Sequence, residues 1–170
     1  MKNFLRTIGI SLCLALSSAS FAENTAKKPE VDYLYVQIAP QAVLKEVDSK
    51  TKTYELTLME VNQHVEYFSD RPERIAGIMK VNTFLDEWNK SFKKTPPNVS
   101  LTGLEKKVLR RVPISVIVEL TNPIYNAEKK IITYTVKLLP DESVPSKEIK
   151  FHGIALFFDN YCASCVANGF

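Results

Sequence analysis

The residue pair with the most obvious chemistry is Cys162 and Cys165, which are separated by two residues near the end of the chain. This spacing occurs in thiol oxidoreductases, in zinc sites and in c-type haem attachment sites. Haem attachment requires a histidine after the second cysteine, where this chain has Val166. Zinc requires two further ligands, and the only histidines are His64 and His152. We therefore expect a structural disulfide, with a redox-active pair as the alternative, and no bound metal or cofactor.

A second set of reactive side chains comprises His64, Ser69 and Asp70, the residue types of a hydrolytic triad. They lie close together in one stretch of chain, whereas the members of such triads normally come from separate elements. The sequence also has no Gly-x-Ser-x-Gly nucleophile motif. Since no nucleophile and base stand in a recognisable arrangement, the sequence favours a protein that is not an enzyme.

Residues 67–74, with the sequence YFSDRPER, are a candidate ligand-binding segment that we call the arginine turn. Arg71 and Arg74 together are suited to holding an anionic group through paired hydrogen bonds. Tyr67 and Phe68 would then stack on a sugar or a base. In the alternative interpretation, Asp70 pairs with the arginines and braces the turn, which is the commoner use of such residues.

The densest basic cluster is formed by Lys106, Lys107, Arg110 and Arg111, within the sequence EKKVLRR. Such a cluster is attracted to an anionic membrane surface or to lipopolysaccharide by about 1 kcal/mol per charge close to the lipid. The alternative is an ordinary solvated connection between two elements.

The first 22 residues have the pattern of a secretory signal peptide. Lys2 and Arg6 precede an apolar run over residues 8–16, and Ser20 and Ala22 are the small residues that a signal peptidase recognises. We predict a signal peptide over 1–22, a disordered leader over 23–30 and one domain over 31–170. Two of the 22 basic residues lie in the signal, so the formal charge of +3 falls to +1. This balance argues against nucleic acid as a partner, and no later apolar run is long enough to span a membrane.

The elements that position these residues are mostly strands. Alternation of apolar and polar residues predicts strands over residues 33–38, 54–59, 64–68, 99–104, 114–120 and 132–138, with a possible short strand at 42–47. Residues 151–158 are apolar on both faces, which predicts a strand covered on both sides. Asn122 and Pro123 predict a bulge, and residues 126–129 predict a turn.

One helix is expected, because Val81, Phe84, Leu85, Trp88 and Phe92 recur at helical spacing. Thr83 followed by Asp86 resembles a capping box at its start. The fold class predicted by these elements is mainly β: an antiparallel, β-sandwich-like single domain with one covering α-helix.

Three motifs occur in order along the chain: YFSDRPxR at residues 67–74, the helix around Trp88, and VELxxPxY at residues 118–125. On these motifs, residues 33–158 resemble a family of uncharacterised exported bacterial proteins. The resemblance implies no established activity and no catalytic residue. Cys162 and Cys165 lie outside the part that it covers.

The sequence thus predicts an exported protein, periplasmic or secreted, that binds a protein, glycan or lipid without catalysis. The arginine turn and neighbouring loops would make the contacts, since loops on a rigid sheet commonly do so. One alternative is a secreted effector that acts on a membrane or envelope through the basic cluster. A further alternative is a thiol oxidoreductase acting through Cys162 and Cys165.

Overall fold

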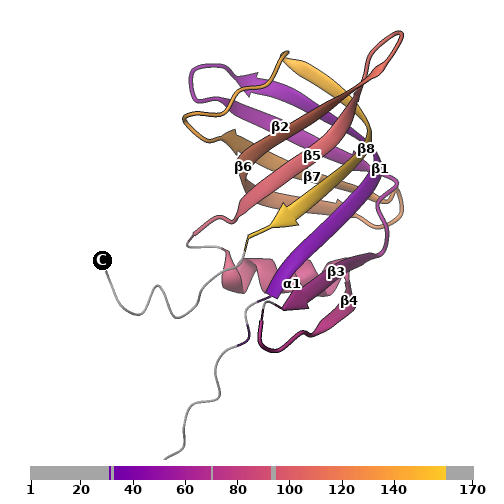
Figure 1. The fold of residues 1–170 in the computed structure, drawn as a ribbon, viewed down its shortest axis with the longest axis vertical. Helices are drawn as coiled ribbons and strands as arrows, with labels where there is room; N and C mark the ends of the chain where they lie inside the picture. The colour runs from indigo at the N-terminus through magenta and orange to yellow at the C-terminus, as the bar shows by residue number, and fades with distance from the viewer. Residues whose placement is uncertain (1–30, 32, 70, 93–94, 160–170) are drawn as a thin grey trace, which may run out of the picture.

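A computed structural model describes residues 31, 33–69, 71–92 and 95–159, apart from the side chains of residues 89–91. It is mainly β, with eight strands and one helix in a single domain (Figure 1). In chain order the elements are β1 (Tyr33–Asp48), β2 (Thr53–Met59), β3 (His64–Ser69), β4 (Ala76–Lys80), α1 (Val81–Ser91), β5 (Asn98–Lys106), β6 (Arg111–Asn126), β7 (Ile131–Leu138) and β8 (Glu148–Phe158).

All strands belong to one antiparallel sheet, and six of them form a closed ring. The order is β2-β7-β6-β5-β8-β1-β3-β4, and β1 also pairs with β2. The 16-residue strand β1 closes the ring because its first part pairs with β3 and its later part with β2, while β8 runs along its other side. The expected antiparallel β domain is therefore confirmed, and its two facing walls are parts of the same continuous sheet.

The inside of the ring is filled by side chains at alternate positions of each strand. The alternation shifts by one residue at one point of β1 and at the paired point of β8. Strand β1 buries Gln37 and Ala39 and then Ala42 and Leu44. Beside this shift, β8 buries Phe151 and then Ile154, Leu156 and Phe158. Gly153 lies in this interval with φ +89°, a backbone conformation that favours glycine and is typical of a bulge.

Helix α1 lies across one end of the closed sheet (Figure 1). Its Trp88 is 4% exposed and packs on Tyr134 of β7 and Phe158 of β8, each with ring centroids 5.7 Å away. Phe84 adds a further contact to Phe158 at 5.3 Å. The expected aromatic helix face is therefore confirmed, and it seals this end of the core.

Several local predictions need correction. The helix begins at Val81 after Lys80, with no side-chain cap, so the capping box at Thr83 is wrong. Residues 42–47 continue β1 instead of forming a second strand. Strand β8 is not covered on both sides, since Phe157 is 46% exposed. Strand β4 was not predicted. The bulge at residues 122–123 is confirmed by the register shift between β6 and β7.

Candidate functional site

The arginine turn connects β3 to β4 at the α1 end of the molecule (Figure 1). Ser69 closes its base: its backbone N–H donates to the Ile75 carbonyl, and its Oγ accepts from the Ile75 N–H, both at 2.8 Å. Arg71 and Arg74 are exposed, whereas Asp70 lies outside the described residues. Both arginines of the turn therefore lie at the surface.

The two aromatic residues of the arginine turn do not form one stacking surface. Tyr67 packs edge-on against Tyr33, with ring centroids 5.4 Å apart, and its ring covers Gly77 so closely that a Cβ there would lie 2.6 Å from the phenol oxygen. Phe68, the next residue of the strand, is 41% exposed and faces the other side of the sheet. Tyr67 therefore packs this hairpin, and only Phe68 remains available beside the arginines.

The expected basic cluster lies at the opposite end of the molecule, at the β5–β6 connection (Figure 1). The connection is a tight turn, closed by the Lys107 N–H donating to the Arg110 carbonyl at 3.0 Å. Its two central residues are apolar and in water: Val108 is 100% exposed and Leu109 is 95% exposed. We call residues 106–111 the basic tip.

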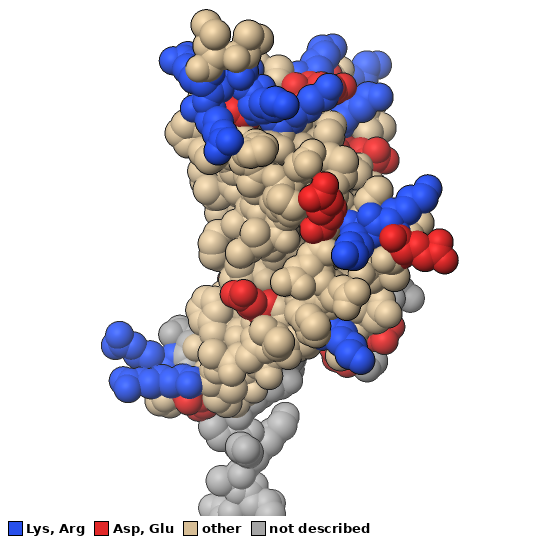
Figure 2. Space-filling view, turned by 90° about the vertical axis from the view of Figure 1, so that its right-hand side faces the viewer, with Lys and Arg blue, Asp and Glu red and all other residues tan. Residues whose placement is uncertain are grey.

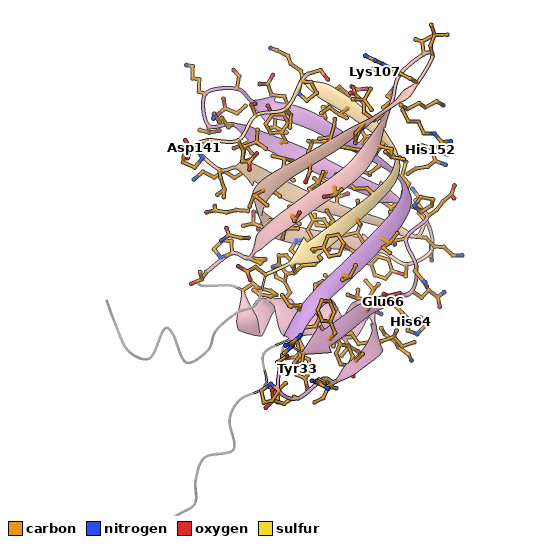
Figure 3. The ribbon with its side chains drawn as sticks, viewed as in Figure 1. Tyr33, His64, Glu66, Lys107, Asp141 and His152 are labelled. Carbon is orange, nitrogen blue, oxygen red and sulfur yellow. The ribbon has the colours of Figure 1, made fainter. Side chains whose placement is uncertain are left out.

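The four cations of the basic tip flank its two apolar residues, Val108 and Leu109, along the chain. Glu105, which is 4% exposed, forms an ion pair with Lys107 at the base of the turn. Within the described chain, no carboxylate forms an ion pair with the three remaining cations, Lys106, Arg110 and Arg111. Figure 2 shows basic side chains gathered at this end of the molecule with uncharged atoms at its extremity, and Lys107 is labelled there in Figure 3.

Sequence reasoning found the cations of the basic tip and missed Val108 and Leu109. The signal was present as two apolar residues between two pairs of basic residues. Because an apolar pair in a connection is usually turned toward a core, only the turn geometry shows that both side chains point into solvent. The apolar apex changes the chemistry from that of a solvated loop to that of an amphipathic contact surface.

The hydrolytic set is not assembled. The Ser69 hydroxyl fixes the arginine turn, and His64 lies at the other end of β3, five residues or about 17 Å along an extended strand. His152 is exposed on β8. Among the residues placed by the structure, no group of three or more His, Cys, Asp or Glu side chains is arranged to hold a metal ion. Cys162 and Cys165 lie outside the described residues, so their disulfide and the redox alternative stay predictions.

Two hollows are open to solvent elsewhere on the described surface. A groove of about 870 Å³ lies between the outer face of β1 and the β2–β3 loop. A smaller one of about 470 Å³ lies where Trp88 and Phe92 meet the β6 bulge at Asn122 and Pro123. Neither is lined by a residue of the arginine turn or of the basic tip.

In the described part of the chain, no helix combines the length and apolar character needed to cross a bilayer. Comparison with known proteins gave no matching family model, no matching curated protein and no matching solved structure. The resemblance to exported bacterial proteins therefore stays a prediction.

Proposed function

We propose that this chain is an exported, non-enzymatic binding protein that attaches to an anionic lipid surface through the basic tip. The observation that carries the proposal is the exposure of Val108 and Leu109, at 100% and 95%, between two pairs of cations. Apolar side chains placed in this way enter the boundary between headgroups and acyl chains, while the cations remain among the anionic headgroups.

The magnitudes favour weak and reversible attachment. Three cations without an acidic partner contribute about 3 kcal/mol at an anionic surface. Full burial of Val108 and Leu109 adds about 1.5–3 kcal/mol each. Association costs at least about 4 kcal/mol of translational and rotational freedom. The net free energy therefore supports recruitment to a charged surface and does not support permanent anchoring.

The tip is well suited to this role because it is already ordered. It extends two long paired strands, β5 and β6, whose register continues up to Lys106 and Arg111. The ion pair between Glu105 and Lys107 fixes its base. Since little conformational freedom is lost on contact, more of the interaction energy is available for binding. The signal-peptide pattern of residues 1–22 supports export to a compartment bounded by lipid.

Vesicle co-sedimentation tests the proposal. We expect the protein to bind vesicles with about one-third phosphatidylglycerol, to bind neutral phosphatidylcholine vesicles much more weakly, and to be released by salt. Replacing Val108 and Leu109 by serine should weaken binding by about 10-fold or more. Replacing Arg110 and Arg111 by glutamine should weaken it by about 30-fold.

The matched control removes two positive charges elsewhere. Lys129 and Lys137 are exposed lysines outside the tip, and replacing both by glutamine should change vesicle binding by less than about twofold, because charge effects fall off within a Debye length of about 8–10 Å. Equal binding to anionic and neutral vesicles, or equal losses in the tip and control variants, would refute lipid attachment through the basic tip. Absence of vesicle binding by the unaltered protein would refute it as well.

A second candidate function is the binding of an anionic ligand at the arginine turn, and the exposure of Arg71, Arg74 and Phe68 favours it. The two candidates are separable because the two surfaces lie at opposite ends of the molecule (Figure 1). Replacing Arg71 and Arg74 by alanine should abolish binding in a screen of sulfated glycans and phosphorylated sugars. The same change should leave vesicle binding by the basic tip intact.

A further inference from the structure

Strand β1 has an interval in which one of its edges pairs with no strand. On this side its pairing with β3 ends at Val36 and its pairing with β2 begins at Gln41. On the other side β8 continues past this interval. Continuing the two registers places residues 39–40 opposite the loop of residues 60–63 and residues 37–38 opposite the start of β3, and no backbone hydrogen bond joins residues 37–40 to the described loop. We call this interval the β1 gap.

The loop opposite the β1 gap is held in place and does not fill it. Val61 is 1% exposed, and its N–H donates to the Lys130 carbonyl at 3.0 Å. The Gln63 carbonyl accepts from the N–H of Val81, the first residue of α1, at 2.9 Å. Side chains of the β1 gap and of this loop line the groove of about 870 Å³. This volume lies within the range of ligand sites in proteins.

The groove combines an apolar floor with an acidic rim. The outer face of β1 supplies Val36, Ile38 and Pro40, and Ile38 is 55% exposed. The rim carries two carboxylates, Glu60 and Glu66, against one cation, Lys130, and it also carries Asn62, Gln63 and His64. Figure 3 shows His64 and Glu66 on the same side of the molecule, away from the basic tip.

We infer that the β1 gap binds an extended peptide segment of another protein, with an apolar side chain on the floor and basic side chains toward Glu60 and Glu66. An unpaired strand edge beside an apolar groove is the arrangement in which peptides add to a sheet. Four residues of strand span about 13 Å, which is enough for the central part of a pentapeptide. The two carboxylates disfavour an anionic lipid as the occupant, so this site is separate from the proposed membrane contact.

Calorimetric titration of the full chain with capped pentapeptides tests this inference. We expect the peptide KVIVK to bind and the peptide EVIVE, of equal length and opposite charge, to bind about 2- to 30-fold more weakly, the range expected of two exposed ion pairs. Methylating the central backbone nitrogen of KVIVK should weaken binding, because it removes a main-chain donor that pairs with the strand edge. The amide NMR signals of residues 37–39 and of Gln41 should shift on addition of KVIVK.

Variants of the groove locate the site. Replacing Glu60 and Glu66 by glutamine should remove the preference for KVIVK over EVIVE, and Ile38→Ser should weaken both peptides. The controls are Ile124→Ser, an exposed isoleucine of β6, and the pair Glu55→Gln and Glu128→Gln, two exposed acids outside the groove. No KVIVK binding at millimolar concentration, or equal affinity for the two peptides, would overturn the inference. Loss of binding in the basic-tip variants would overturn it as well, because it would move the contact to the other site.

Discussion

Gln37 is a polar side chain inside the closed sheet, with 2% of its surface exposed. Its Oε1 accepts a hydrogen bond of 2.7 Å from the Tyr134 hydroxyl, and its Nε2 has no partner among the described residues. Burial raises the pKa of Tyr134, so the phenol stays protonated and keeps donating. The pair is a polar contact in the middle of an otherwise apolar aromatic cluster.

We expect Tyr134→Phe to lower the free energy of unfolding by about 1–2 kcal/mol, because it leaves the Gln37 carbonyl oxygen buried without a donor. The double variant Gln37→Leu/Tyr134→Phe should be more stable than Tyr134→Phe alone, since both polar groups are then removed together. Urea denaturation of the four proteins of this cycle measures the coupling. Additive effects of the two substitutions would show that the hydrogen bond does not contribute to stability.

Gln37 also shows a limit of prediction from sequence at the level of single residues. Leu34, Val36 and Ile38 alternate with Tyr33, Tyr35 and Gln37, and apolarity alone turns the first three inward. The structure buries Gln37 and leaves Ile38 55% exposed. The inward face is set by the ring of neighbours around β1 and by Tyr134, which is far away in sequence, so the local pattern does not contain the answer.

Helix α1 was the most predictable element, because one apolar face at a period of 3.6 residues leaves few alternatives. Strand β4 was missed, since its five residues include Gly77, which weakens a strand pattern and here admits the Tyr67 ring. The sequence also contains every residue of both candidate surfaces. The strand predicted over residues 64–68 implies that Tyr67 and Phe68 face opposite sides, but the exposure of Val108 and Leu109 could not be predicted, because it depends on turn geometry.

The contribution of α1 to the core is testable with its aromatic face. Phe84→Ala should lower the free energy of unfolding by about 3–5 kcal/mol, because it opens a cavity between α1 and Phe158. Trp88, the only tryptophan of the chain, lies 5.8 Å from Phe84, so its fluorescence should shift to longer wavelength as water approaches.

The matched control is Phe157→Ala, which removes the same side chain from the outer face of β8, where it is 46% exposed. We expect a loss of less than about 1 kcal/mol and no change in Trp88 emission. Equal losses for Phe84→Ala and Phe157→Ala would contradict the assignment of α1 as the seal of the core.

Across the whole molecule, the ring and the β3–β4 hairpin differ in how they are supported. Strand β8 pairs with β1 on one side and with β5 on the other over most of its length, whereas β3 pairs with only the first four residues of β1, and β4 is the last strand of the order. We expect the amides of β3 and β4 to exchange with deuterium by about 100-fold or more faster than those of β1 and β8 in the ring. Native-state exchange followed by NMR measures this difference. Uniform protection of all eight strands would show that the hairpin and the ring open as one unit.

The closure of the sheet could not be predicted from the sequence, although seven of the eight strands were expected. Closure depends on β1, which pairs with β3 in its first part and with β2 in its later part. The alternation of apolar and polar residues indicates which face of a strand is buried, but it does not indicate which strands lie beside it. The same partner change produces the β1 gap, so the proposed peptide site was equally invisible in the sequence.

Strand β1 starts, and its neighbour β8 finishes, at the end of the molecule that carries α1, away from the β5–β6 connection (Figure 1). A fluorophore or an affinity handle joined near Tyr33 or Asp159 would consequently stand about the full height of the protein from a bilayer. Such a label would leave the contact with lipid unobstructed, and energy transfer from it to a dye in the headgroups would report whether the molecule stands upright or lies on its side.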